Sequence, residues 1–407
     1  MREIQVAVLG GGPSGASVAA LLKRRGLEPV IFERESFPRF SIGESLLPQC
    51  TGLLEEAGLL RTVVEGGFQY KNGAAFRRGE RRTEFDFRDK SSQGWGSTWQ
   101  VQRADFDQRL LRGAEALGVE VNERHELKDA QFGPDGALLS LQSPAGPLQV
   151  KARFVLDASG FGRVLPRLLK LESPSGLPMR QAYFTHVDDG IVRGEMDRSK
   201  ILVSVHPRHK DIWFWTIPFS NGRCSLGVVG EPQLLDSLPG DEMARLKAWV
   251  ADTPWLAELL RNAVWDTPAR ILKGYSANVS SLHGPSWALL GNAGEFLDPV
   301  FSSGVTIALK SASMAAPLVA AQLAGKAADW ENDYAKPLKK GVDAFRAFVE
   351  SWYRGGFQDV IFYEQAQPEV RRYICSILAG YAWDLGNPYV AEPRRLAALE
   401  EICKSAA

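Results

Sequence analysis

Residues 9–17, LGGGPSGAS, decide the fold of this chain, because they place a glycine cluster between an apolar run and a helical pattern. The run before them, residues 4–9, is rich in β-branched side chains and predicts a buried strand. Residues 14–25 have the apolar spacing of a helix, and residues 29–32 predict a second strand. Strand, helix and strand in this order are typical of a βαβ unit with two parallel strands.

The glycine cluster also predicts a binding site. Its spacing satisfies G-x-G-x-x-G, in which loop amides and the helix N-terminus hold a pyrophosphate that a side chain at the second glycine would block. Glu33 closes the second strand about twenty residues further on, where a carboxylate can accept hydrogen bonds from ribose hydroxyls. A plain strand-to-helix turn is the alternative, but these features together predict nucleotide binding, without distinguishing FAD from NAD. The loop residues assigned to this role are Gly10, Gly12, Pro13, Ser14 and Gly15.

Composition favours a reducing, aqueous compartment. The chain has 407 residues, and its 48 basic and 48 acidic side chains balance, so neither a nucleic-acid footprint nor a polybasic membrane anchor is indicated. The four cysteines are far apart and the five histidines lack metal spacing, so we expect neither a disulfide framework nor a metal site. The N-terminus lacks a signal-peptide pattern, and the apolar stretch near residues 315–324 is too short to span a bilayer. We expect a cytoplasmic protein.

The pattern of elements predicts an α/β (α+β) fold with a doubly wound, Rossmann-like part. We expect strands within residues 69–88, a helix over 104–117, strands at 119–122, 152–156 and 287–290, and helices over 299–323 and after 329. Residues 181–270 are mostly strand-like, which indicates an inserted antiparallel sheet. The expected domains are a discontinuous nucleotide-binding domain (1–70, 100–175 and 271–328), a β-rich substrate domain (71–99 and 176–270) and a C-terminal helical lid (329–407).

Residues 211–218, DIWFWTIP, contain two tryptophans that one strand would send to the same face of its sheet. An aromatic core strand is the plain interpretation. However, WFWTIP matches the W-x-W-x-I-P signature completely, and with the glycine loop it resembles the flavin-dependent halogenases of the FAD-dependent hydroxylase superfamily. The resemblance covers most of the chain and favours the phenol- and pyrrole-type members.

This resemblance implies an activity and its partners. Such enzymes use reduced FAD, oxygen and chloride or bromide to form hypohalous acid, which travels through a tunnel to an electron-rich aromatic substrate. Trp213 and Trp215 would separate the flavin from that substrate and exclude water. No second glycine motif for NADPH is present, so a separate flavin reductase would supply reduced FAD. A phenol or pyrrole, free or on a carrier protein, would be halogenated in secondary metabolism, including antibiotic biosynthesis.

Residues 68–79, FQYKNGAAFRRG, resemble the strand that carries the relay lysine of these halogenases, which makes Lys71 the candidate. A solvated lysine is the plain alternative. Burial disfavours the charged form of an amine, so a buried Lys71 could instead hydrogen-bond hypohalous acid or form a haloamine.

Later motifs resemble the FAD contacts and halide site of the same family. Asn292 stands where a GDA motif normally has aspartate, which removes a charge but keeps a hydrogen-bonding side chain. The turn DPVFSSGV, residues 298–305, would hold halide on backbone amides at a helix start, near Ser302, Ser303 and Gly304, with a plain helix cap as the alternative. Phe301 replaces a glutamate of the tryptophan halogenases, which argues against free tryptophan as substrate. The resemblance assigns further cofactor contacts to Glu33, Arg39, Arg103, Asp157, Asn292 and Asp298.

Several assignments stay open at this point. Glu44, in GESLLP, is a candidate ancillary acid or base, with a surface or capping role as the alternative. An FAD-dependent aromatic hydroxylase or monooxygenase of the same superfamily is the second hypothesis, which Asn292 and Phe301 favour. A non-catalytic flavin-binding protein is the third.

Overall fold

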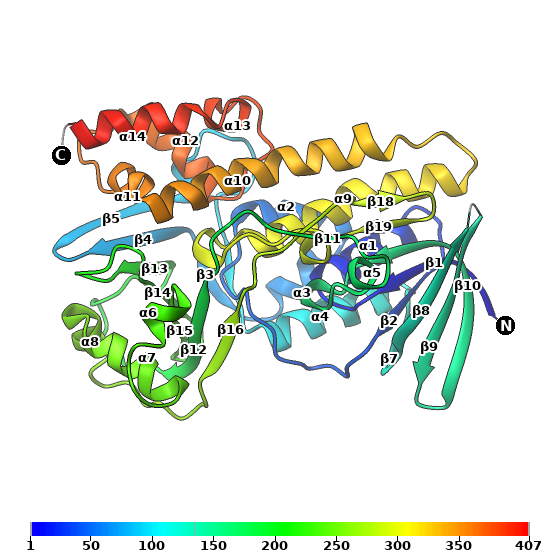
Figure 1. Ribbon diagram of the computed structural model, residues 1–407, viewed down its shortest axis with the longest axis horizontal. Helices are drawn as coiled ribbons and strands as arrows, with labels where there is room; N and C mark the ends of the chain where they lie inside the picture. The colour runs from blue at the N-terminus through cyan, green and yellow to red at the C-terminus, as the bar shows by residue number, and fades with distance from the viewer. Residues whose placement is uncertain (1, 134, 406–407) are drawn as a thin grey trace.

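The computed structural model describes residues 2–133 and 135–405. It contains two large sheets and a group of C-terminal helices, and Figure 1 shows most of these helices near β4 and β5, with α10 extending from there past α9. The predicted α/β (α+β) class, with a parallel sheet, a separate and mostly antiparallel sheet and terminal helices, is confirmed.

The larger sheet has the strand order β18-β19-β10-β1-β2-β7, and β8 and β9 continue from β10 as antiparallel neighbours. The strands β1, β2, β7, β10 and β19 run parallel. Their bounds are β1 Arg2–Leu9, β2 Pro29–Glu33, β7 Glu120–Glu123, β8 Glu126–Gly133, β9 Gly136–Ser143, β10 Gly146–Asp157, β18 His283–Gly284 and β19 Trp287–Leu289. Because parallel strands end at one edge, β1, β2 and β10 bring Leu9, Glu33 and Asp157 to the same edge of the sheet.

The second sheet has the order β16-β12-β15-β14-β13-β4-β5 and is antiparallel except where β13 pairs with β4. Its strands are β4 Gly73–Arg78, β5 Arg81–Asp86, β12 Gln181–Asp188, β13 Lys200–Val205, β14 Trp213–Pro218, β15 Arg223–Gly230 and β16 Arg270–Lys273. A short pair, β3 Gln69–Lys71 with β6 Thr98–Gln100, precedes and follows β4 and β5 along the chain.

The helices cover the sheets. Those packed around the larger sheet are α1 Pro13–Lys23, α2 Pro48–Ala57, α3 Leu60–Val64, α4 Arg103–Ala116, α5 Val164–Leu168 and α9 Ser303–Leu323. Those beside the second sheet are α6 Pro232–Leu235, α7 Glu242–Ala251 and α8 Pro254–Leu259. The C-terminal group is α10 Lys336–Arg354, α11 Gly356–Ile361, α12 Pro368–Leu378, α13 Pro388–Ala391 and α14 Arg395–Ser405, and the short pair β11 Glu172–Ser173 with β17 Asn278–Val279 completes the fold.

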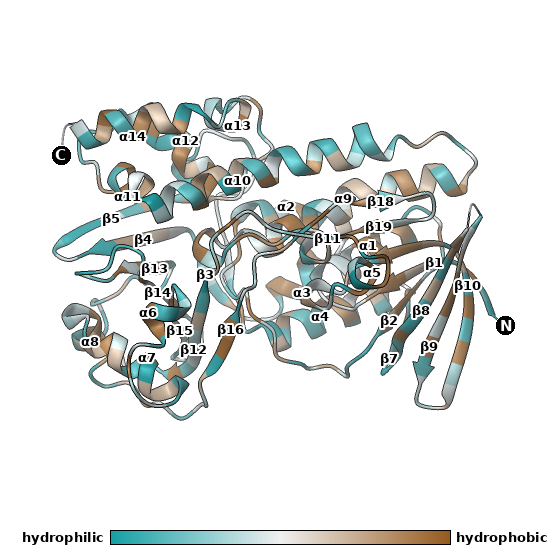
Figure 2. Cartoon of the chain, in the orientation of Figure 1, coloured by the Kyte–Doolittle hydropathy of each residue, from teal (hydrophilic) through white to brown (hydrophobic). Residues whose placement is uncertain are grey.

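Three sequence expectations need correction. The β8–β9 hairpin was not predicted, and the helices α6 to α8 interrupt a region that was expected to be mostly strand. The expected helix over residues 299–323 is present as α9, but its 21 residues are long and apolar enough to cross a membrane by length and composition, whereas the apolar stretch near residues 315–324 was expected to be too short. Slightly more than half of its apolar window is buried inside the protein, where α9 packs on α1 and α2, so it serves as a core helix here. Figure 2 shows it flanked by other hydrophobic segments.

Candidate active site

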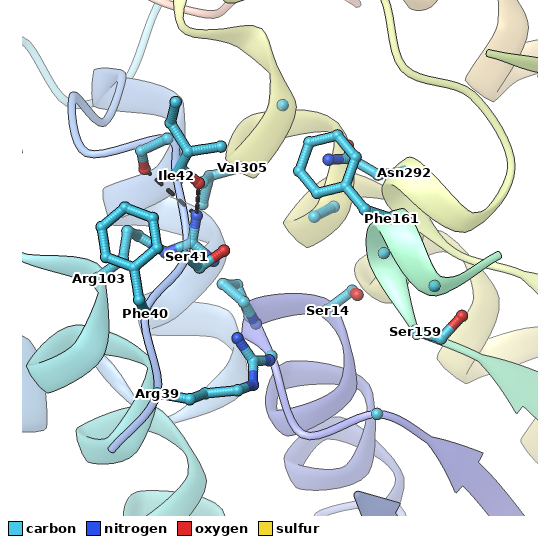
Figure 3. A pocket seen from close by; sticks show the side chains of 18 of the residues that line it. Ser14, Arg39, Phe40, Ser41, Ile42, Arg103, Ser159, Phe161, Asn292 and Val305 are labelled. Carbon is cyan, nitrogen blue, oxygen red and sulfur yellow. Dashed lines mark hydrogen bonds between the residues drawn. The ribbon is translucent and has the colours of Figure 1, made fainter. Parts of the chain in front are cut away.

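A cavity of about 520 Å³ opens where the two sheets meet. One end is lined by the glycine loop, Glu33 and Arg39, and the other by apolar side chains of the second sheet, including Phe184, Trp215 and Ile217. In Figure 3, Asn292 and Phe161 lie across the opening from Arg39 and the segment that follows it. The cavity therefore has a polar end and an apolar end.

The glycine loop approaches its neighbours too closely for side chains. Gly10 has φ +100°, in the left-handed region, and a Cβ there would lie 2.7 Å from the carbonyl oxygen of Ala158. A Cβ on Gly15 would lie 1.9 Å from the carbonyl oxygen of Gly10. Gly10, Gly12, Pro13 and Ser14 line the cavity, whereas Gly15 lies behind the loop and allows it to close against α1.

Glu33 is fixed by backbone donors. One carboxylate oxygen accepts from the Gly11 amide at 2.8 Å and the other from the Glu35 amide at 2.8 Å. The side chain is buried and lines the cavity, with Arg39 Nη2 at 3.8 Å. It therefore stands where a ribose would reach it if the glycine loop held a pyrophosphate.

The two predicted arginines share a partner that the sequence analysis missed. Arg103 donates to both carboxylate oxygens of Asp107, at 2.7 and 2.9 Å, and Arg39 Nη1 lies 3.6 Å from the same carboxylate. Arg103 also donates to the carbonyl oxygen of Ile42, as Figure 3 shows. Both arginines line the cavity. The i, i+4 spacing of Arg103 and Asp107 on a helix was the available signal for this pair.

Asp157 and Asn292 have different positions. Asp157 is fully buried, accepts from the amides of Ser159 at 2.9 Å and Leu165 at 2.7 Å, and does not line the cavity. It holds the turn after β10, so the structure places it behind the site rather than against a ligand. Asn292 lines the cavity, and its buried Oδ1 has no hydrogen-bond partner among the described residues. An acceptor of this kind fits a ligand that donates to it.

The start of α9 faces the cavity. Ser302 occupies the cap position with φ +55° and makes no side-chain cap, which corrects the alternative of an ordinary serine cap. Ser302, Gly304 and Val305 line the cavity, whereas Ser303 is buried outside its wall. The first amides of α9 therefore lack a side-chain acceptor at a positive helix end, an arrangement that suits an anion.

Asp298 lies away from the cavity wall. Its carboxylate accepts from the hydroxyls of Tyr353 at 2.8 Å and Tyr275 at 3.1 Å and from the Val300 amide at 2.9 Å. Burial raises its pKa to about 6. These three donors occupy the carboxylate, so the expected direct cofactor contact is replaced by a structural role under the turn.

Trp213 and Trp215 do point to one face of β14, with ring centroids 5.9 Å apart. Trp215 lines the apolar end of the cavity, and its Nε1 donates to Ser225 at 3.0 Å. Trp213 is buried next to it, and its Nε1 donates to the hydroxyl of Tyr353 at 3.0 Å. Only Trp215 meets the cavity directly, while Trp213 supports it from behind.

Lys71 is completely buried at the end of β3. Its Nζ donates to the Ser45 hydroxyl at 2.7 Å and to the carbonyl oxygen of Leu46 at 2.7 Å, and it lies 5.3 Å from the Phe87 ring centroid. No carboxylate pairs with it among the residues that the structure describes. Burial lowers the pKa of Lys71 to about 7, so the amine changes protonation near neutral pH. Lys71 itself does not line the cavity, but Ser45 does.

Glu44 has a partner that sequence spacing could not reveal. Its buried carboxylate lies 2.7 Å from Nε2 of His186, a residue of β12 that is 142 positions away. Glu44 lines the cavity and His186 stands behind it. A surface role for Glu44 is therefore wrong, because its buried carboxylate faces the cavity with His186 bonded to it from behind.

The site fits FAD. The cavity is lined by a side-chain-free cradle, by a carboxylate placed for ribose, by an aromatic wall and by an amide oxygen without a partner among the described residues. In agreement with this fit, residues 3–334 match the family described as FAD binding domain. The chain belongs to this family of FAD-binding flavoproteins.

The flavoprotein is similar to halogenases over most of its length. It is 27% identical to the 1H-pyrrole-2-carbonyl-[peptidyl-carrier protein] chlorinase of Pseudomonas fluorescens, over 93% of this chain and 89% of that protein. It is 40% identical to a flavoprotein/dehydrogenase from Cytophaga hutchinsonii, with a TM-score of 0.96 and full coverage of both chains. A flavin-dependent brominase is 26% identical, with a TM-score of 0.86, over 99% of this chain and 100% of the other. The flavoprotein is thus an FAD-dependent oxidoreductase of the halogenase and monooxygenase family.

Proposed function

We propose that this flavoprotein is a halogenase that attaches chloride or bromide to an electron-rich aromatic ring, a phenol or a pyrrole. Bound FAD, supplied in reduced form by a separate flavin reductase, provides the oxidising chemistry that turns halide and oxygen into hypohalous acid. The residues Gly10, Gly12, Pro13, Ser14, Glu33, Arg39 and Arg103 would hold FAD at the polar end of the cavity. Similarity to a chlorinase of a carrier-bound pyrrole supports a carrier protein as a further partner.

The observation that carries this proposal is the buried, unpaired amine of Lys71 behind the apolar end of the cavity. Burying an amine without a paired carboxylate costs stability, because desolvation disfavours its charge, so its presence supports a functional role. With its pKa at about 7, Lys71 can hold or release a proton at neutral pH, and it is hydrogen-bonded to Ser45, which lines the cavity. The wall that includes Trp215 would keep water and substrate apart from the flavin.

Other parts of the chain complete the proposal. The uncapped start of α9, with Ser302, Ser303 and Gly304, is the proposed halide site, and Glu44 with His186 is the proposed acceptor for the ring proton. Residues 71–99 and 176–270 would form the substrate domain, residues 1–70, 100–175 and 271–328 the FAD domain, and residues 329–407 the lid. A cytoplasmic role in secondary metabolism, including antibiotic biosynthesis, is proposed on the family resemblance.

The test is mass spectrometry of products formed from a panel of phenols and pyrroles with FAD, a flavin reductase, NADH, oxygen and either halide. We expect a halide isotope pattern that is lost at least 100-fold in Lys71→Ala, while FAD still binds. The exposed Lys326→Ala is the matched control and should retain activity. Product without halogen in every reaction would overturn the proposal.

An aromatic hydroxylase is the second candidate, because the family includes FAD-dependent monooxygenases as well as halogenases, and the relative that is 40% identical is not named as a halogenase. Asn292 and Phe301 also depart from the halogenase pattern. A gain of one oxygen atom, unaffected by halide and by Lys71→Ala, would establish this alternative.

A further inference from the structure

Two adjacent residues of one loop connect the cavity to two titratable groups that lie behind its wall, the buried Lys71 and the partly buried His186. Glu44 and Ser45 both line the cavity, and each is hydrogen-bonded to a group that does not line it. The carboxylate of Glu44 is bonded to His186 and the hydroxyl of Ser45 to Lys71. Lys71 therefore has no direct face on the cavity, and any effect that it has there must pass through a neighbour.

The surroundings of Lys71 leave Ser45 as that neighbour. The two acceptors of Nζ are the Ser45 hydroxyl and the carbonyl oxygen of Leu46, and the carbonyl has no proton to pass on. Phe87 contributes a ring face from the other side. The titratable group that faces Lys71 is the thiol of Cys50 on α2, and burial raises its pKa, so it is neutral near pH 7.

The hydroxyl of Ser45 can act in two directions. A serine hydroxyl donates one proton and accepts at two lone pairs. When Lys71 is an ammonium, Ser45 must accept from it, and the serine proton then has no acceptor among the described protein groups and is free to donate into the cavity. When Lys71 is a neutral amine, the hydroxyl can donate to the nitrogen lone pair instead, and the cavity loses this donor.

We propose that Ser45 is the positioning residue through which Lys71 acts on the substrates of the cavity. The inference rests on the proposed halogenase function and deepens it. With Lys71 protonated, Ser45 donates to the oxygen of hypohalous acid and polarises the bond between oxygen and halogen. The aromatic carbon bonds to the halogen, and the electron pair of the broken bond goes to oxygen. Glu44, the proposed acceptor of the ring proton, passes that proton to the hydroxide that leaves, so halogenated ring and water are the products.

The test compares Ser45→Ala, Ser45→Thr, Lys71→Met and the double variant Ser45→Ala/Lys71→Met in the halogenation assay. We expect a 10- to 100-fold lower kcat for Ser45→Ala, recovery in Ser45→Thr, and no further loss when Ser45→Ala is added to Lys71→Met, because the two side chains act as one unit. The matched control is Ser204→Ala, which removes a buried hydroxyl that has no partner among the described residues and lies outside the cavity lining.

Two further measurements distinguish a role of Ser45 in transmitting the protonation state of Lys71 from a purely structural role. The kcat of the wild type should fall as pH rises above about 7, where Lys71 loses its proton, and Ser45→Ala should flatten this part of the profile. In addition, NMR titration of 13C-labelled Lys71 in the FAD-bound protein should show a lower pKa in Ser45→Ala, because the ammonium loses one of two acceptors.

The outcomes distinguish this inference from the function on which it rests. Activity of Ser45→Ala within twofold of wild type, additive losses in the double variant, or an unchanged Lys71 titration would overturn the role of Ser45 and leave the halogenase standing. Absence of halogenated product from the wild type would overturn both.

Discussion

The two ends of the cavity are built in different ways. The polar end is made mostly of backbone: the glycine loop between β1 and α1 and the amides that hold Glu33 come from one βαβ unit. The apolar end is made of side chains that meet across the fold, with Glu44 bonded to His186 over 142 positions and Trp213 to Tyr353 over 140. A site made of one local backbone segment can be predicted from the spacing of residues in the sequence. A site made of side chains that are far apart in the sequence cannot, because only the folded chain brings them together.

The strongest test of the backbone end is Gly15→Val. A Cβ there would lie 1.9 Å from the carbonyl oxygen of Gly10, and backbone atoms cannot move away as a flexible side chain could. We expect FAD affinity, measured by fluorescence titration, to fall about a thousandfold, equivalent to about 4 kcal/mol. Gly52→Ala is the control, because its Cβ would meet Trp95 at an ordinary 3.5 Å, and it should bind FAD like the wild type. Normal affinity in Gly15→Val would show that the loop does not cradle the cofactor.

The same contrast explains what sequence reasoning could predict. The βαβ unit, the fold class and nucleotide binding follow from local periodicity and glycine spacing, FAD follows from the family resemblance, and the comparisons confirm the fold and the FAD family. The β8–β9 hairpin and the helices α6 and α8 were missed because they lack a strong local pattern: β8 has no buried residue, and α6 and α8 are only four and six residues long. Short elements depend on the tertiary surface on which they pack.

A second test addresses the side-chain end through stability. The pKa of Lys71 is about 7 in the folded protein and 10.5 ordinarily, so between these values the unfolded chain binds a proton that the folded chain does not. Stability of the wild type should therefore rise with pH across this window, relative to Lys71→Met, by about 1.4 kcal/mol per pH unit.

Chemical denaturation at pH 7, 8 and 9 measures this difference. Lys326→Met, at an exposed position, should leave the pH dependence of the wild type unchanged. If the difference in free energy of unfolding between the wild type and Lys71→Met stayed constant with pH, Lys71 would have the same pKa in the folded and unfolded states. The lowered pKa of the buried amine would then be wrong.

A third test concerns the aromatic wall. Gly227 pairs with Trp215 across β14 and β15, and a Cβ there would lie 2.2 Å from the indole ring. Gly227→Ala should therefore displace Trp215, cost about 1–3 kcal/mol of stability, and raise the share of NADH electrons lost as hydrogen peroxide in a coupled assay. Adding Trp215→Phe removes the atoms that clash and should recover stability without restoring the wall. If Gly227→Ala released no more hydrogen peroxide than the wild type, Trp215 would not be the residue that shields the flavin from water.

The side-chain end could be predicted only in part. The family signature directed attention to Lys71 and Trp215, but it could not show that Ser45 separates Lys71 from the cavity or that Trp213 stands behind Trp215. It also suggested cofactor contacts for Asp157 and Asp298, whose carboxylates are occupied by backbone amides and tyrosine hydroxyls. Motif residues can shape the turns around a ligand without touching it.

The smallest expected effect is at Asn292. Its side chain lies on the cavity wall, next to the backbone at the start of α9. Its buried Oδ1 needs a donor, and no described protein group supplies one. If bound FAD donates to this oxygen, a carboxylate can accept the same bond, so Asn292→Asp should change FAD affinity less than about threefold near neutral pH. Asn292→Leu loses the acceptor and should bind about tenfold more weakly, about the worth of one hydrogen bond. Fluorescence titration compares both with Asn221→Leu at an exposed position. If Asn292→Leu bound FAD as tightly as the wild type, FAD would not donate a hydrogen bond to the Asn292 side chain.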